Sequence, residues 1–270
     1  MTAIHTLRVP GAHLHYEVRG SGPLLLLMGS PMEAAAFASL ADVLAGDRTV
    51  VTHDPRGISG STLDDPGEDT AVDRRADDVV AILDALGADS ADVFGSSGGA
   101  VTGLALVARH PDRVRALVAH EPPVMELLPD AAECRAMTED IIETFHREGQ
   151  GAAWMKFMTG AGFDDESCEE APAGPHGEPS AQDVANGDRF FGHDLRATAG
   201  YVPDVPALTA APTRVVVGVG ATSKGLITYR TSVALAELLG TRPAEFPGDH
   251  AGFLEDPNGF AEALRRTLEG

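Results

Sequence analysis

Cysteine and lysine are both scarce in this sequence of 270 residues. The two cysteines, Cys134 and Cys168, show no metal-binding spacing and form no disulfide framework. We therefore expect a protein of the reducing cytoplasm, with neither a metal nor an organic cofactor implied. Only two lysines are present, so arginine carries nearly all of the positive charge.

Long apolar runs are also missing. The longest aliphatic run, Leu24–Met28, is far too short to span a bilayer. The first residues contain no basic segment followed by an apolar one, so we expect no secretory signal. The formal net charge of -21 disfavours nucleic-acid phosphates and anionic membrane surfaces as partners.

Short apolar runs alternate with helical patterns along most of the chain. This alternation predicts an α/β fold with a mostly parallel sheet and helices on both of its faces. The predicted strands cover residues 13–18, 24–28, 48–53, 91–94, 114–120, 214–218 and 244–246. The predicted helices cover residues 33–45, 72–86, 98–109, 227–239 and 257–268.

The alternation breaks between Pro122 and Pro206. That region contains helical patterns at 131–148 and 151–160 and an acidic, proline- and glycine-rich stretch at Asp164–Ser180, which we expect to be a loop. A helical insertion between core strands commonly forms a lid over a site. We therefore predict a core of residues 1–122 and 207–270 and a helical cap of residues 123–206.

A candidate nucleophile lies in the segment VFGSSGGA. Its G-x-S-x-G pattern is weak by spacing alone, but a predicted strand precedes it and a predicted helix follows it. A sharp turn of this kind tolerates only small neighbours, and here they are glycines. Ser97 would then present its hydroxyl at a helix N-terminus, which favours developing negative charge.

A serine hydroxyl needs a base and an oxyanion hole to act as a nucleophile. Among ten histidines, His250 stands out because it follows the last predicted strand and precedes the last helix. His193, inside the insertion, is better interpreted as an ordinary surface residue. The backbone N–H of Gly98 and that of Ser30, after strand 24–28, are the predicted oxyanion donors.

These features resemble the α/β-hydrolase superfamily along the whole chain outside the insertion. The resemblance rests on LLLLMGSP, HDPRGISGS, VFGSSGGA, RHPDRVRALVAHEPP and FPGDHAGF. It implies an eight-stranded sheet and a catalytic acid in the turn after strand 214–218. MGSPM departs from the usual His-Gly-x-Pro-Gly of the superfamily at its first and last positions. The turn expected to hold the acid reads ATSK, without a carboxylate.

The acid is therefore expected elsewhere. Glu121 is the first residue beyond the apolar run of LVAHEPP, at the end of the strand next to that of the nucleophile. The chain is similar here to the lactone hydrolases that open zearalenone, and that similarity implies Glu121 as the acid. Asp204, in a proline-flanked loop, is the second candidate, and Asp249 is expected to point away from His250.

The sequence thus predicts a serine hydrolase that cleaves a small-molecule carboxylic ester or lactone through an acyl-enzyme. A cofactor-free C–C bond hydrolase or perhydrolase with the same triad is one alternative, and a non-catalytic ligand-binding receptor of the same fold is another. A homodimer is left open. Aromatic residues of the insertion are candidates for the substrate pocket, with burial in the core of the lid as their competing interpretation: Trp154, Phe190, Phe191 and Tyr201.

Overall fold

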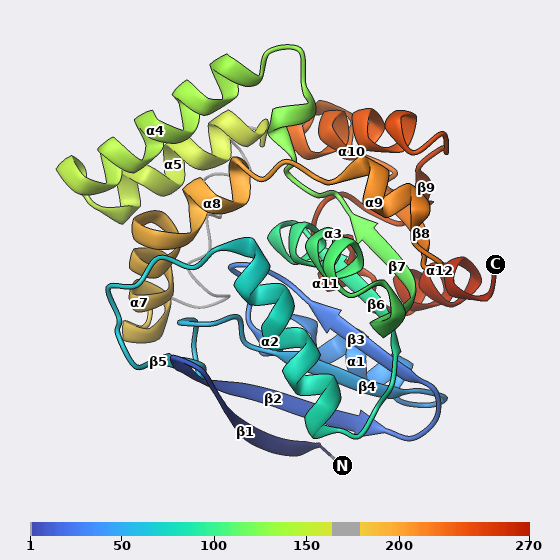
Figure 1. The fold of residues 1–270 in the computed structure, drawn as a ribbon. Helices are drawn as coiled ribbons and strands as arrows, with labels where there is room; N and C mark the ends of the chain where they lie inside the picture. Colours follow the sequence, from blue (N-terminus) through green and yellow to red (C-terminus); the bar gives the residue numbers. More distant parts are fainter. Residues whose placement is uncertain (1, 164–178) are drawn as a thin grey trace.

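One β-sheet organises the computed structural model, which describes residues 2–163 and 179–270 (Figure 1). Its strands are β1 (Ala3–Val9), β2 (Ala12–Gly20), β3 (Leu24–Met28), β4 (Thr49–His53), β5 (Thr62–Leu63), β6 (Ala91–Ser96), β7 (Val114–His120), β8 (Arg214–Gly220) and β9 (Ala244–Phe246). Eight of them follow the order β1-β2-β4-β3-β6-β7-β8-β9, and β5 pairs with β2. The pairs of β2 are antiparallel, whereas those from β4 to β9 are parallel. The predicted mostly parallel, eight-stranded sheet is confirmed, with β5 as a short addition.

Helices cover both faces of the sheet. The core helices are α1 (Ala38–Leu44), α2 (Val72–Ala85), α3 (Gly98–Arg109), α9 (Val205–Ala210), α10 (Ile227–Leu238), α11 (Gly252–Glu255) and α12 (Pro257–Glu269). Buried residues of α2, α3, α9 and α10 share one apolar cluster, and those of α1, α11 and α12 share another. Strand β3 contributes to both, because successive side chains of a strand point to opposite faces. Leu26 and Met28 join the first cluster, and Leu25 and Leu27 join the second.

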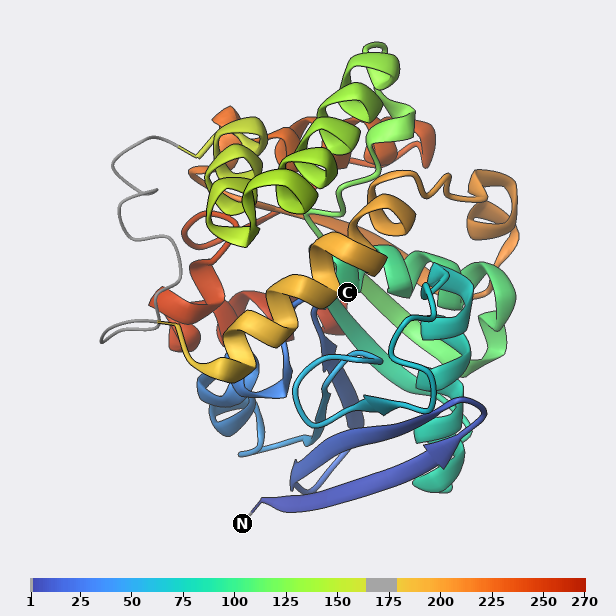
Figure 2. The same ribbon diagram turned by 90° about the vertical axis from the view of Figure 1, so that its left-hand side faces the viewer.

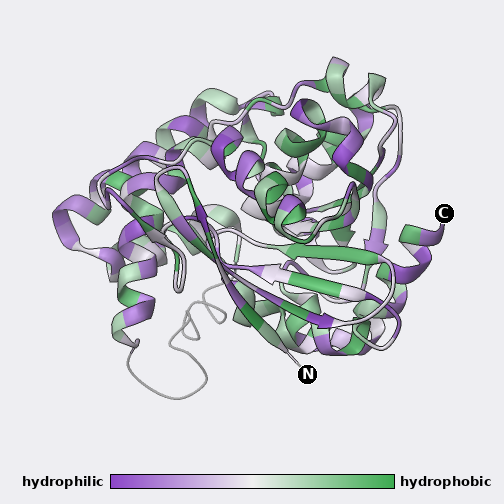
Figure 3. Ribbon diagram, turned by 60° about the horizontal axis from the view of Figure 1, so that its bottom comes forward, coloured by the Kyte–Doolittle hydropathy of each residue, from purple (hydrophilic) through white to green (hydrophobic). Residues whose placement is uncertain are grey.

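The hydropathy of the elements matches this layering. Figure 3 shows hydrophobic residues concentrated along the central strands, and hydrophilic and hydrophobic residues mixed along the surrounding helices. Parallel strands covered on both faces are expected to be apolar throughout. No helix in either described range is long and apolar enough to cross a membrane.

Residues 123–206, which we call the cap segment, carry further helices between β7 and β8. Those in its described part include α4 (Ala131–Glu148), α5 (Gln150–Ala161), α7 (Ala181–Arg189), a π-helical turn at Phe190–Asp194, and α8 (Leu195–Ala199). These helices lie on one side of the sheet in both views (Figures 1 and 2). Residues of α4, α5, the π-helical turn and α8 share a third apolar cluster. The predicted boundary at residue 206 falls inside α9, whose Leu208 packs in the first cluster.

Several elements differ from the sequence prediction. The helix expected at 33–45 begins as a 3-10 turn at Ala34–Phe37 before α1, a common way for a helix to start. Strand β1 and helices α7 and α8 were not predicted. Most of the loop predicted at Asp164–Ser180 lies outside the described residues; Ser180 caps α7 by accepting from the Asp183 N–H.

Candidate active site

Ser97 occupies a strained turn between β6 and α3. Its backbone has φ 55° and ψ -126°, a conformation that non-glycine residues rarely adopt. The Ser97 N–H donates to the His120 carbonyl at 2.9 Å, which ties the turn to the end of β7. The turn also packs tightly: a Cβ added at Gly99 would lie 2.2 Å from the Met28 carbonyl oxygen. Ser97 is thus held at the N-terminus of α3 by contacts that leave little freedom.

Glu121 follows β7 directly and is wholly buried. Its Oε1 accepts from the Gly220 N–H and its Oε2 from the Thr228 hydroxyl, both at 2.9 Å. Its Oε2 also lies 2.7 Å from Nδ1 of His250. Glu121 has φ 49°, another strained backbone value. The structure therefore brings the candidate acid and the candidate base into direct contact.

The charge state of Glu121 fixes the proton on His250. Burial raises the pKa of Glu121, but the hydrogen bond from His250 and the charges of His250 and His120 outweigh it and leave that pKa at about 2. Glu121 is therefore a carboxylate at neutral pH and can only accept hydrogen bonds. The proton of the shared bond then belongs to Nδ1 of His250. In the neutral imidazole, Nε2 keeps a lone pair that can accept a proton.

The other candidate acids do not reach His250. Asp204 caps α9 by accepting from the Ala207 N–H at 3.0 Å. Asp249 accepts from the Ala251 N–H at 2.7 Å and so shapes the loop that carries His250. The last residue of β8, just before the acid-free turn, contributes to the site, because the N–H of Gly220 donates to Glu121.

The loop after β3 places Ser30 against the turn of Ser97. A Cβ added at Gly98 would lie 2.6 Å from the Ser30 carbonyl oxygen, so the two backbones are close neighbours. Asp54, after β4, accepts from the Ala34 N–H at 2.8 Å and from the Gly60 N–H at 2.8 Å. These bonds fix the loops that surround Ser30.

A cavity of about 320 Å³ lies between these residues and the cap segment. Ser30, Ser97, Gly98 and His250 line it. Ser97 and His250 both line the cavity, but no hydrogen bond joins these two described residues. The rest of the described wall is mostly apolar: Pro31, Met32, Pro123, Met125, Met137, Thr138, Ile141, Trp154, Phe157, Met158, Ala161, Phe163, Phe190, Leu195, Thr198, Ala199, Ile227, Thr228 and Ala251. No Asp, Glu, Lys or Arg occurs among these described lining residues.

The predicted aromatic residues separate into two groups. Trp154 and Phe190 line the cavity, with stacked rings 5.5 Å apart. Phe191 and Tyr201 are not among its lining residues. Phe191 is buried in the apolar cluster of the cap segment, and Tyr201 packs against the first core cluster. His193 bonds to Asp69 at 2.7 Å, away from this wall.

Three residues of the site were not predicted from the sequence to belong to it. Thr228, which donates to Glu121, is the second residue of α10, and a hydroxyl there is no signal by itself. Phe157 lines the cavity one helical turn from Trp154, and this i, i+3 spacing is the signal that could have found it. Arg75, near the start of α2, is buried and donates to the Ser30 hydroxyl at 3.0 Å.

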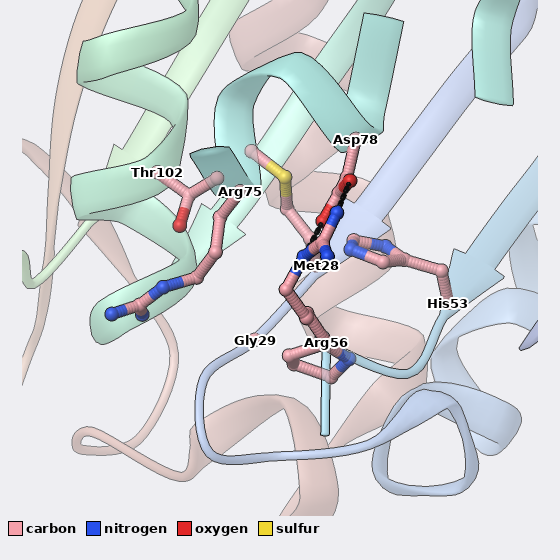
Figure 4. A pocket seen from close by; sticks show the side chains of 8 residues that line it. Met28, Gly29, His53, Arg56, Arg75, Asp78 and Thr102 are labelled. Atoms are coloured by element: carbon pink, nitrogen blue, oxygen red, sulfur yellow. Dashed lines mark hydrogen bonds and ion pairs between the residues drawn. The ribbon is translucent and has the colours of Figure 1, made fainter. Parts of the chain in front are cut away.

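A second, much smaller cavity of about 10 Å³, with polar residues in its wall, lies beside the start of the loop after β3 (Figure 4). It has room for roughly one water molecule. Arg56 and Asp78 form a buried ion pair on its wall, with Nε and Oδ2 at 2.8 Å. Across the described residues, no group of three or more His, Cys, Asp or Glu side chains is placed to hold a metal ion.

Comparison with known proteins gives consistent matches. A family model described as alpha/beta hydrolase fold matches residues 22–154. The protein named Uncharacterized hydrolase YraK, of Bacillus subtilis, is 35% identical over 271 residues, covering 98% of this chain and 95% of that protein. Zearalenone hydrolase of Bionectria ochroleuca is 35% identical over 140 residues, covering 50% of this chain and 52% of that protein.

Solved structures resemble the whole chain. A thermophilic esterase from Thermogutta terrifontis matches with a TM-score of 0.75 at 20% identity, covering 100% of this chain and 98% of that one. The enol-lactonase from Burkholderia xenovorans LB400 matches with a TM-score of 0.73 at 19% identity, covering 98% and 100%. At such low identity these two likenesses show a shared fold.

Proposed function

Because this chain belongs to the α/β-hydrolase family, we propose that it is a serine hydrolase that cleaves carboxylic esters or lactones through an acyl-enzyme. The observation that carries the proposal is the 2.7 Å contact between His250 and the buried Glu121, at a cavity wall shared with Ser97. This arrangement supplies a nucleophile, a base and an acid in one place.

The proposed reaction uses each group in turn. The Ser97 oxygen attacks the carbonyl carbon of the ester while Nε2 of His250 takes the hydroxyl proton. The oxyanion of the tetrahedral intermediate is bound by the backbone N–H groups of Ser30 and Gly98. The intermediate collapses, the C–O bond of the ester breaks, and His250 returns the proton to the leaving alcohol. Water then attacks the acyl-enzyme with the same proton transfers in reverse order and releases the acid.

Glu121 serves the imidazole throughout this cycle. Its carboxylate holds the Nδ1–H tautomer and offsets the positive charge that His250 gains when it accepts the proton. The Gly220 N–H and the Thr228 hydroxyl keep the carboxylate oriented, so its position does not depend on the histidine alone.

The chemistry of the cavity wall favours an uncharged, apolar substrate. Its described wall carries methionine, aromatic and aliphatic side chains and no formal charge. A substrate carboxylate or ammonium placed against that wall would lose its hydration without a charged partner, which is costly. We therefore expect neutral esters or lactones to be preferred over charged ones of equal size.

A labelling and activity experiment tests the proposal. The wild-type protein should react covalently with a fluorophosphonate and hydrolyse a neutral phenyl ester, and Ser97→Ala should do neither while keeping its fold. Labelling retained by Ser97→Ala would place the nucleophile elsewhere, for instance at Ser96. Turnover of a β-diketone in preference to every ester and lactone tested would overturn the proposed reaction class.

A further inference from the structure

The Ser30 side chain has a hydrogen-bond arrangement that its backbone role does not require. Ser30 is 4% exposed, and its Oγ lies 3.0 Å from Nη1 of Arg75. A guanidinium can only donate hydrogen bonds, so the Ser30 oxygen accepts this one. The proton of the Ser30 hydroxyl is thus left free to donate in another direction.

The cavity is a direction in which that proton can point. Ser30 is one of the lining residues, together with Ser97 and Gly98. Its Oγ lies 3.2 Å from the position that a Cβ on Gly98 would take. The hydroxyl is therefore adjacent to the residue whose N–H we assign to the oxyanion.

We propose that the Ser30 hydroxyl is a third oxyanion donor, polarised and oriented by the buried Arg75. This inference rests on the proposed function, because it concerns the tetrahedral intermediate formed at Ser97. The hydroxyl donates to the oxyanion while its own oxygen accepts from a cation. Such a donor is stronger than an isolated hydroxyl, because hydrogen-bonded chains polarise one another in a low-dielectric site.

Arg75 is the positioning residue in this arrangement. Figure 4 shows its guanidinium extending from α2 away from the Arg56–Asp78 pair, and its Nη2 donates to the Thr198 hydroxyl of α8 at 2.9 Å. Burial lowers the pKa of Arg75, whereas the charge of Asp194 opposes that change. Arg75 therefore joins the loop after β3 to the cap segment, and it brings a positive charge close to the site where negative charge develops.

Two measurements on Ser30→Ala test the hydroxyl. This variant deletes the oxygen but keeps the backbone N–H. We expect kcat on a neutral phenyl ester to fall on the order of 10²-fold, as for other single oxyanion donors, with little change in KM. The affinity for a trifluoromethyl ketone, which forms a tetrahedral adduct with serine, should fall by a similar factor because that adduct carries the oxyanion.

Ser61→Ala is the matched control. Ser61 is also buried and accepts the His15 N–H through its hydroxyl, but it is not among the residues that line the active-site cavity. Its loss should leave kcat and ketone affinity close to wild type. Wild-type kcat and ketone affinity in Ser30→Ala would overturn the proposal. So would a lower kcat with unchanged ketone affinity, since the hydroxyl would then not act on the oxyanion.

A double-mutant cycle tests Arg75. Arg75→Met should lower kcat in the wild-type background and have little further effect in Ser30→Ala, because it acts through the hydroxyl. Arg75→Lys keeps a cation and should restore part of the lost kcat. Additive effects of Arg75→Met and Ser30→Ala would overturn the positioning role. Failure of this inference remains distinct from failure of the proposed function, which Ser97→Ala tests separately.

Discussion

Glu121 is held in place by several hydrogen bonds, both to its carboxylate and to its backbone. It receives hydrogen bonds from Gly220, Thr228 and His250, and its own N–H donates to the Gly218 carbonyl at 3.0 Å. Three bonds hold the two carboxylate oxygens and one holds the backbone, so the surrounding structure can maintain the strained backbone of this residue. Because Glu121 directly follows β7 and bonds to Gly218 and Gly220 of β8, it links the ends of these two neighbouring strands.

Glu121→Gln should keep the volume of the side chain but remove its charge. The amide can stabilise the wrong tautomer of His250, so we expect kcat to fall on the order of 10³- to 10⁴-fold at neutral pH, as for the equivalent Asp→Asn substitution in a serine protease. Steady-state kinetics on one neutral ester measure this. Asp204→Asn is the control, because its side chain caps α9 and it should cost little. Near-normal turnover by Glu121→Gln would remove Glu121 from the mechanism.

Some of the residues of the candidate site could be predicted from the sequence. The first polar residue after a strand and a histidine after the last strand are positional signals, and they predicted the pairing of Glu121 with His250 that the structure shows. The hydrogen bond from Arg75 to Ser30 joins residues 45 positions apart in the chain, and no local sequence pattern predicts it. Phe190 and Phe191 are neighbours in sequence, so only the three-dimensional packing decides which one faces the cavity.

The element that controls the site is the start of α3, where it meets the end of β3. Gly99 lies there without room for any side chain, because its Cβ would meet backbone atoms of Met28 and Gly29. Backbone atoms cannot move aside as the end of a flexible side chain can. The distance between the Ser97 turn and the loop of Ser30 therefore depends on this glycine.

A pair of glycine substitutions tests this statement. Gly99→Ala should destabilise the protein by about 1–3 kcal/mol or more, as overpacking does, and should lower activity. Gly151→Ala, in α5, meets nothing within 4 Å and should stabilise the protein by about 0.5–1 kcal/mol through helix propensity. Urea unfolding of both variants measures the two free energies. Equal stability of Gly99→Ala and wild type would show that the two elements can separate freely.

The predictability of the elements followed their apolar pattern. The bounds of β3, α3, β7 and α4 in the structure match those predicted, because each is a patterned run of five residues or more; the short β9 also matches. Strand β1 was missed because its side chains are almost all exposed and carry no apolar alternation. Helix α7 is polar as well, and it depends on its capping box and on packing with the rest of the cap segment.

Across the whole molecule, two fully buried histidines link folding to pH. Burial lowers the pKa of His53 to about 4 and that of His120 to about 3, from 6.5 for both when exposed. Below pH 6.5 these two histidines therefore become protonated in the unfolded chain while they stay neutral in the folded protein. Their contribution to stability is complete above pH 6.5 and is lost as the pH falls towards 4 and 3.

The free energy of unfolding should therefore decrease on acidification from pH 7 to pH 5. Each histidine adds a slope of up to about 1.4 kcal/mol per pH unit over that window. The net charge of -21 has the opposite effect on stability, because protonation at lower pH reduces the repulsion among the negative charges of the folded protein. The unfolding should therefore be measured in moderate salt, which screens this repulsion. Urea unfolding of His53→Leu should show a shallower dependence on pH than wild type. His146→Gln, which alters an exposed residue of α4, should keep the wild-type slope; identical slopes for all three proteins would contradict the prediction.

The hydrogen bond between His250 and Glu121 also has a consequence for biosynthesis. The two residues are 129 positions apart in the chain. At about 5–20 residues per second, a ribosome needs roughly 6–26 s to add that interval after Glu121 has been incorporated. Throughout that time the nascent chain already contains Ser97, Glu121, Ser30 and Gly98 but has no His250. In the mechanism proposed above, Ser97 therefore cannot be activated until this late part of the chain has been synthesised and folded.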